Sequence, residues 1–164
     1  VEIDLAKKIA KDLGVKAEFV PITAQTRGPL LYNKQVDAVI GTFTITPERQ
    51  KSYNFTTPYF TDEVGFLLNK ASDFKSVEDL DGKTIGVAQS ASTKNALEAF
   101  GKEKGLSFKY SELADYPTLK TALTSGRIDA FSADKSILSG YVDAKTEIMG
   151  DGFASQEYGI ATKK

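Results

Sequence analysis

The sequence contains no cysteine and no histidine among its 164 residues. Without cysteine, the chain can form neither a disulfide framework nor a site that uses thiol chemistry. Histidine is the commonest general base and the commonest metal ligand in proteins. A Ser–His–Asp triad and a zinc site built on His and Cys are therefore both excluded in this chain.

The sequence also lacks an apolar run that approaches the roughly 20 residues needed to span a bilayer, and it shows no signal peptide. The formal net charge is −1, with no long block of one sign. This balance argues against nucleic acid or a membrane surface as the main partner. Apolar residues make up 41% and charged residues 26%, which is typical of a globular protein.

Both ends of the sequence resemble interior positions of a fold. The chain opens at VEIDLAKKIAKDLG, already inside an amphipathic helix with no N-cap before it, and closes at YGIATKK, just after a strand-like run. We therefore expect an internal piece of a longer protein. In that case, the absence of a targeting signal says nothing about location.

The order of the expected elements predicts an α/β fold. A helix over 1–13 places one apolar stripe on its surface, formed by Val1, Leu5, Ile9 and Leu13. A strand at 16–22, a short helix at 25–35 and a buried strand at 36–43 follow. Helices that alternate with short apolar strands indicate a mostly parallel sheet.

Part of this pattern occurs twice. The motif VDAV at 36–39 matches IDAF at 128–131, and a glycine, a strand and a helix precede each copy with nearly the same spacing. Two copies predict two similar lobes. We interpret Asp37 and Asp129 as structural, because they recur where no common ligand contact is needed.

The two lobes are expected at 1–67 and 68–155, with 156–164 as a strand that returns to the first lobe. Residues Val64–Leu68 form the expected crossover strand between the lobes. Because the chain crosses twice, we expect a hinge with a cleft between the lobes.

The segment TFTITPER at 42–49 begins as a strand and ends as a helix. Thr42, Thr44 and Thr46 alternate, so we expect one strand face to present hydroxyls. Thr46 is a candidate N-cap, and Arg49 projects from the following turn. Its planar guanidinium matches a carboxylate through two parallel hydrogen bonds. An equally good interpretation is a capped surface helix with a solvated arginine.

Two later segments also follow predicted strands. In VAQSASTKNAL, Ser92 is a candidate N-cap, and the backbone N–H groups near Thr93 favour an anion, although ordinary helix capping is the simpler interpretation. In RIDAFSADKSIL, Asp134 can cap the next helix or hold an ammonium group. Ligands of open α/β sheets bind beyond the carboxyl ends of strands. An arginine, a helix N-terminus and an aspartate together suit an α-amino acid.

The stretch VDAVIGTFTITPERQKSYNFTTPY strongly resembles the signature of the family 3 extracellular solute-binding proteins. DLDGKTIGVAQSAS and RIDAFSADKSIL resemble that family's second lobe, so the likeness covers essentially the whole chain. It implies a two-lobed, periplasmic-binding-protein-like (type II) fold that closes on a polar amino acid for an ABC importer. The implied partners are a free amino acid and the transporter permease. The implied location is extracytoplasmic, in the periplasm or as a surface lipoprotein. No cofactor, metal or catalytic residue is implied.

The resemblance also implies individual ligand contacts in the first lobe and at one helix of the second. Arg49 occupies the position that clamps the α-carboxylate. Thr44 and the backbone at Thr42 would bond the carboxylate and the ammonium. Ser92 and Thr93 would add helix-terminal N–H donors.

Three further positions bear on the ligand's charge. Asp134 would pair with the ammonium group. Arg27 and Tyr116 resemble the aspartate/glutamate-binding branch, in which Arg27 would meet a side-chain carboxylate with Tyr116 nearby. The expected ligand is glutamate or aspartate, and then glutamine. The alternatives are a solvated helix-start residue for Arg27 and simple packing for Tyr116.

The sequence departs from the family pattern at its ends. Family members normally begin with a strand whose aromatic residue covers the ligand, and helices complete their first lobe after the second crossing. If the natural protein lacks these segments, we expect a swapped or partner-completed assembly or poor stability, because ladder groups and apolar surface would be exposed. A well-folded monomer in light scattering and thermal melting would contradict that expectation.

The sequence is also compatible with two other functions. A few solute-binding-like proteins are enzymes, such as cyclohexadienyl dehydratases or lytic glycosidases, because a fold does not fix a function. Without His or Cys, such an enzyme would use carboxylates, Lys or Tyr, and no pair of carboxylates converges in these motifs. The other possibility is the ligand-sensing domain of a receptor, which only flanking transmembrane segments would distinguish.

Overall fold

The computed structural model describes residues 1–150 and 152–164. The chain divides into two compact units. Unit 1 comprises Val1–Phe60 and Glu157–Lys164, and unit 2 comprises Thr61–Gln156. The lobe boundaries expected from the sequence stay a prediction.

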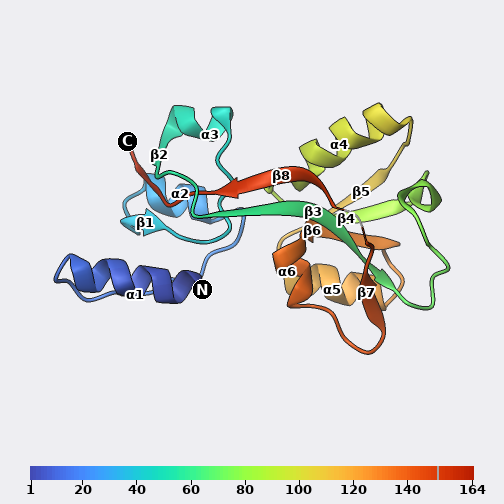
Figure 1. Cartoon of the computed structure of the whole chain (residues 1–164), viewed down its shortest axis with the longest axis horizontal. Coiled ribbons are helices and arrows are strands. Elements are labelled where there is room, and N and C mark those ends of the chain that lie inside the picture. The colour runs from blue at the N-terminus through green and yellow to red at the C-terminus, as the bar shows by residue number, and fades with distance from the viewer. Residues whose placement is uncertain (151) are drawn as a thin grey trace. The chain divides into compact units, whose positions relative to one another are not determined.

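The chain passes between the units within two strands. It leaves unit 1 in β3 (Phe60–Asn69) and returns in β8 (Phe153–Tyr158). These two strands pair with each other, and Figure 1 shows them running together. Both covalent connections therefore consist of extended, hydrogen-bonded backbone.

Unit 1 contains a small antiparallel sheet with short helices around it. Its helices are α1 (Glu2–Asp12), α2 (Arg27–Tyr32) and α3 (Pro47–Ser52), and its strands are β1 (Ala38–Val39), β2 (Tyr53–Phe55) and β9 (Ala161–Lys163). Strand β9 lies between β1 and β2 and is antiparallel to both. A buried apolar cluster lies beneath this sheet and consists of Leu31, Val39, Phe43 and Ala161. The returning end of the chain therefore supplies the central strand of unit 1.

Two strands expected in unit 1 are wrong in extent. Residues 16–22 form no strand, and Phe19 and Val20 are about half exposed there. The expected strand at 36–43 shrinks to β1, because the backbone of Thr42 turns to a left-handed φ of 44°. Thr44 makes only an isolated bridge to Tyr158. The expected strand face lined by alternating hydroxyls is therefore also wrong.

Unit 2 contains a mixed sheet whose strands alternate with helices. The strand order is β5 (Lys109–Leu113), β4 (Thr84–Ala88), β6 (Ala130–Asp134), β3 and β7 (Thr146–Ile148). Strand β4 is parallel to β5 and β6, and β3 is antiparallel to β6 and β7. The helical segments are η1 (Val77–Leu80), α4 (Thr93–Lys104), α5 (Tyr116–Thr124) and α6 (Lys135–Ser139). The α/β fold class is therefore confirmed. The mostly parallel sheet expected in each lobe is wrong for unit 1, whose sheet is antiparallel, and in unit 2 only β4 with β5 and β6 is parallel.

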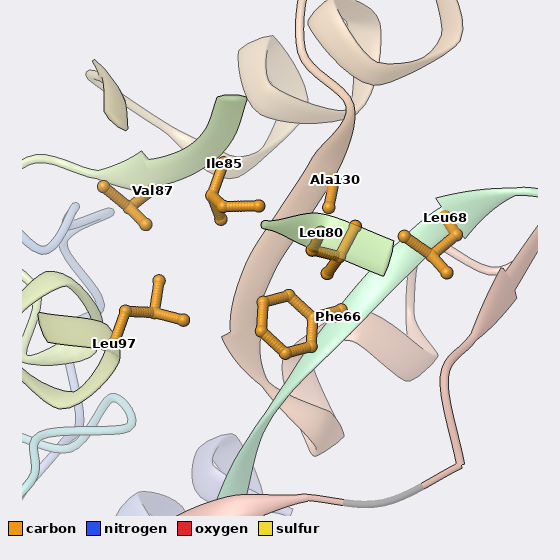
Figure 2. Close-up of a cluster of buried hydrophobic side chains, with 7 residues drawn as sticks. All are labelled: Phe66, Leu68, Leu80, Ile85, Val87, Leu97 and Ala130. Atoms are coloured by element: carbon orange, nitrogen blue, oxygen red, sulfur yellow. The ribbon is translucent and has the colours of Figure 1, made fainter. Parts of the chain in front are cut away.

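The core of unit 2 fixes the sheet against α4 and η1. Figure 2 shows its buried cluster, with the Phe66 ring near the middle of the view, and the cluster comprises Phe66, Leu68, Leu80, Ile85, Val87, Leu97 and Ala130. None of these side chains is more than 2% exposed. They come from β3, η1, β4, α4 and β6, so burial of this cluster packs these elements together.

Asp129 has the structural role expected for the repeated motif. Its Oδ2 accepts a hydrogen bond from the Thr84 N–H at 2.8 Å, and its own N–H donates to the Thr84 carbonyl at 2.9 Å. These contacts join the start of β4 to the residue before β6. They align the two parallel strands on which the later residues of the site stand.

Lys120 joins α5 to the segment before β7. Its Nζ lies 2.9 Å from Asp143 Oδ2 and donates to the Tyr141 carbonyl at 2.7 Å. The hydrogen bond from Lys120, followed by those from the Lys145 N–H and the Thr146 hydroxyl, lowers the pKa of the Asp143 carboxyl. The folded state therefore prefers the ionised form of this carboxyl.

We expect this preference to make the free energy of unfolding depend on pH in the acid range. A pKa that is lower in the folded than in the unfolded state stabilises the fold above the unfolded value of about 3.9, and the stabilisation disappears as pH falls through the folded value. Asp143→Asn should therefore lower the melting temperature near neutral pH, and the difference from the wild type should shrink progressively below about pH 4. Circular dichroism melts across this range measure it, with the exposed Asp73→Asn as control. A difference that persists unchanged in acid would contradict the assignment.

Candidate functional site

Two arginines share one aromatic platform in unit 1. The guanidinium carbon of Arg27 lies 4.3 Å from the centroid of the Phe43 ring, and that of Arg49 lies 4.8 Å from the same centroid. Phe43 is itself buried, and its ring contacts Phe55 edge-on with centroids 5.3 Å apart. The buried ring holds both cations by cation–π attraction. Two positive charges are therefore concentrated at one point of unit 1.

Both guanidinium groups are also fixed by backbone carbonyls. Arg27 Nη1 donates to the carbonyls of Gly41 at 3.0 Å and Thr42 at 3.1 Å. Arg49 Nη1 donates to the Thr44 carbonyl at 2.9 Å. The structure thus brings together the residues of unit 1 that the sequence predicted, namely Arg27, Thr42, Thr44 and Arg49. Guanidinium groups fixed in this way suit a carboxylate.

The local sequence explains the position of Arg49. Thr46 is the N-cap of α3, and its hydroxyl accepts a hydrogen bond from the Arg49 N–H at 3.1 Å. Pro47 occupies the first turn, where its missing N–H costs nothing. The capped turn expected from TFTITPER is confirmed.

Arg27 is 5% exposed, so the alternative of a solvated residue at a helix start is wrong. Arg27 is the first residue of α2, and its guanidinium points inward to the Phe43 ring and to the carbonyls of the two residues that precede Phe43. Burial of a charged group is costly unless the group is paired or hydrogen-bonded. Its contacts hold the bend at 41–42 in place.

The predicted residues of unit 2 all lie at or just beyond the carboxyl ends of parallel strands. Thr93 begins the helix after β4, Tyr116 begins the helix after β5, and Asp134 is the last residue of β6. Since β5, β4 and β6 are parallel neighbours, these ends lie at one edge of the sheet. The position of these residues beyond the strand ends follows the sequence analysis, and their role in binding stays a prediction.

Ser92 takes the N-cap position of α4 but makes no side-chain capping hydrogen bond. Its hydroxyl instead donates to Gln156 Oε1 at 2.8 Å. The backbone of Ser92 is helical, with φ −75° and ψ −11°, which takes its side chain away from capping geometry. The first-turn N–H groups of α4 therefore receive no cap from this hydroxyl.

Asp134 and Tyr116 have different surroundings. Asp134 is 6% exposed, and its carboxylate makes no capping hydrogen bond to α6, so ordinary capping does not explain it. The Tyr116 ring stacks on Phe131, with centroids 6.1 Å apart, which agrees with the packing alternative. A ligand that joins these residues to those of unit 1 stays a prediction.

Sequence reasoning missed three residues that shape the site. Phe43 lies between two threonines of the quoted motif, and its large apolar side chain was the only signal in the sequence that it is buried. Glu2 accepts a hydrogen bond from the Thr42 N–H, and the Tyr59 hydroxyl donates to Glu2. These two residues lie 40 and 17 residues from Thr42 in the sequence. No local pattern links residues so far apart.

Unit 2 also contains a cavity of about 380 Å³ that is separate from the predicted site residues. It is lined by Phe66, Phe100 and Phe153, with Lys75 and Lys104 among its polar residues. None of the predicted site residues lines it. Within the described ranges 1–150 and 152–164, no cluster of His, Cys, Asp or Glu is arranged to hold a metal ion. The helices in these ranges include none with the length and hydropathy of a membrane span.

Two family models match the chain. The model of the bacterial extracellular solute-binding proteins, family 3, matches residues 1–92, and the NMT1/THI5 like model matches residues 54–163. This chain belongs to the bacterial extracellular solute-binding proteins of family 3. The resemblance identified from the motifs is therefore confirmed.

Known relatives align along nearly the whole chain. The ABC transporter glutamine-binding protein GlnH of Bacillus subtilis is 39% identical over 170 residues, which cover 99% of this chain and 60% of the relative. The glutamine-binding protein of Geobacillus stearothermophilus is 33% identical, with 99% and 63% covered. The chain thus spans less than two thirds of the length of these relatives.

Solved structures share the fold. An ancestral arginine-binding protein bound to glutamine has a TM-score of 0.89 and 36% identity, with 99% of this chain and 73% of that chain covered. The ancestral amino acid-binding protein AncCDT-1, a precursor of cyclohexadienyl dehydratase, has a TM-score of 0.87 and 32% identity, with 99% and 71% covered. The periplasmic-binding-protein-like fold expected from the sequence is therefore confirmed.

Proposed function

We propose that this protein binds a free polar amino acid as the extracytoplasmic substrate-binding protein of an ABC importer, with the transporter permease as its partner. The observation that carries the proposal is the pair of guanidinium groups fixed beside Phe43, next to Thr42 and Thr44. A free carboxylate is the group that such an arrangement favours. The two glutamine-binding relatives support a free amino acid as the ligand.

In the proposed mechanism, Arg49 receives the α-carboxylate first. A guanidinium has five N–H donors in one plane, and the bond to the Thr44 carbonyl fixes how that plane is turned. The half-buried position of Arg49 strengthens a charged hydrogen bond relative to open water. Thr44 then bonds the carboxylate. The Thr42 N–H already donates to Glu2, so the Thr42 backbone would contribute its carbonyl, whose second lone pair can accept from the ammonium.

Unit 2 would complete the site. Asp134 would pair with the ammonium, and N–H groups at Ser92 and Thr93 would add to the carboxylate contacts. A ligand that contacts both units only in a closed state shifts the population toward closure. The paired strands β3 and β8 are the connections at which such a hinge motion would occur.

The positive charges favour an acidic ligand side chain. Arg27 and Arg49 together repel a cationic side chain and attract a second carboxylate. We therefore propose glutamate or aspartate, and then glutamine. We propose binding rather than catalysis, because the similar proteins are named as binding proteins.

Isothermal titration calorimetry with glutamate, aspartate, glutamine, arginine and cystine tests this proposal. We expect heat from the acidic amino acids, weaker binding of glutamine and none of arginine. Arg27→Met should lower the affinity for glutamate more than the affinity for glutamine, since only glutamate carries the second carboxylate. Binding of basic amino acids alone would overturn the ligand assignment, and absence of binding for all five would overturn the function.

A further inference from the structure

We propose that Glu2 is a positioning residue for the ligand site, because its carboxylate holds the Thr42 peptide in the left-handed conformation that shapes the site. Glu2 Oε1 accepts a hydrogen bond from the Thr42 N–H at 2.7 Å and another from the Tyr59 hydroxyl at 2.6 Å. All three residues belong to unit 1. The inference rests on the proposed function, in which Thr42 contacts the amino acid.

Thr42 needs such support because its conformation is unfavourable. Its φ of 44° lies in the left-handed region, which a β-branched residue rarely adopts. Strained backbone persists where surrounding contacts determine it, and such strain concentrates at functional sites. The contacts here hold the residue from both sides, since Glu2 accepts from its N–H and Arg27 donates to its carbonyl.

These contacts connect Glu2 to the two arginines. The Arg27 group that bonds the Thr42 carbonyl also lies over Phe43, which is the platform of Arg49 as well. A change in the Thr42 peptide would therefore alter the position of Arg27 first. Glu2 affects the ligand through this chain of contacts and does not itself touch the ligand.

The second donor keeps the carboxylate in place. The Tyr59 side chain is half-buried, and burial, followed by the hydrogen bond to Glu2, raises the pKa of its hydroxyl. Tyr59 therefore stays a hydrogen-bond donor over the range in which proteins are handled. Its backbone N–H donates to the Tyr158 carbonyl at 2.9 Å, so its position is fixed independently of Glu2.

The alternative is that Glu2 only attaches α1 to unit 1. This alternative arises because α1 buries little else, with Ala10 as its buried residue. Two variants separate the roles. Glu2→Ala removes the acceptor, whereas Glu2→Gln keeps an oxygen that accepts from the same donors. Asp4→Ala is the matched control, since Asp4 is an exposed carboxylate in the first turn of the same helix.

The Thr42 amide resonance in nitrogen-15 NMR spectra of the ligand-free protein gives the first readout. A hydrogen bond to a carboxylate moves an amide proton downfield, so we expect a large upfield shift in Glu2→Ala, a smaller one in Glu2→Gln and none in Asp4→Ala. This readout needs no ligand. An unchanged Thr42 resonance in Glu2→Ala would overturn the proposal, whatever the protein binds.

Calorimetric titration with the amino acid gives the second readout. We expect Glu2→Ala to weaken binding at least about tenfold, which corresponds to 1.4 kcal/mol, with partial rescue in Glu2→Gln and wild-type affinity in Asp4→Ala. Should Glu2→Ala fail to fold, Glu2→Gln carries the test through its resonance and its affinity. Equal affinities in wild type and folded Glu2 variants would overturn the positioning role. A wild type that binds no amino acid overturns the proposed function, and the Thr42 resonance then decides the Glu2 contact separately.

Discussion

Replacement of Arg49 by alanine is expected to weaken amino-acid binding by about tenfold to a hundredfold or more, since each charge-assisted hydrogen bond contributes roughly 1.5–3 kcal/mol. The hydrogen bond to the Thr44 carbonyl and the contact with Phe43 already fix the orientation of the guanidinium. The side chain therefore loses little conformational entropy when a carboxylate binds. Such preorganisation lets most of the interaction appear as affinity. Calorimetry with the ligand identified in the five-amino-acid titration measures the loss.

Two variants make the result specific. Arg49→Lys keeps the charge but loses the planar fork, so we expect an intermediate affinity. Lys51→Ala removes a positive charge from the same helix at a position that is 72% exposed and should leave affinity unchanged. A melting curve on each variant verifies folding. If Arg49→Ala binds as tightly as Lys51→Ala, Arg49 does not belong to the site.

The sequence was most informative where the structure depends on neighbouring residues. Thr46 caps the turn that carries Arg49, three positions away, and residue types alone predict that contact. The order of strands and helices in unit 2 is equally local, because each element needs only its own periodicity. These local patterns also carried the motifs from which the family was correctly identified.

The pairing of strands that are distant in the sequence could not be predicted. Strand β9 lies between β1 and β2 although it is more than a hundred residues away from both, and no periodicity selects such a partner. The segment at 16–22 has strand-like residues, but a strand also needs a ladder partner, and none forms there in the described structure. The same limit explains why the shortening of the strand before Thr42 was missed.

The candidate site depends on local and on long-range contacts, and only the local ones could be predicted from the sequence. Residue types pointed to Arg49 as a carboxylate contact, and the family resemblance pointed to Arg27. Neither predicted that both guanidinium groups lie over one phenylalanine ring. The left-handed φ of Thr42 could not be read from a β-branched residue, because the conformation results from contacts with Glu2 and Arg27. Strain that distant residues impose has no local signature.

Replacement of Phe66 by alanine should destabilise unit 2 by about 3–5 kcal/mol, the usual cost of a cavity left by a buried phenylalanine. Phe66 is 1% exposed, and its ring lies 5.5 Å from that of Phe153 and 6.4 Å from that of Phe108. Its strand, β3, pairs with β6, and Val64 stands opposite Asp134 in the register. Because small domains have only about 5–15 kcal/mol of stability in total, this loss is a large part of it.

Urea denaturation followed by circular dichroism measures this effect, and the midpoint should fall by at least about 1 M. Phe66→Leu fills more of the space and should lose less. Val142→Ala is the surface control, since Val142 is 46% exposed in the same unit and its truncation leaves no cavity. Equal midpoints for Phe66→Ala and Val142→Ala would mean that the cluster around Phe66 does not hold β3 to β6. The alignment of Asp134 at the sheet edge would then need another cause.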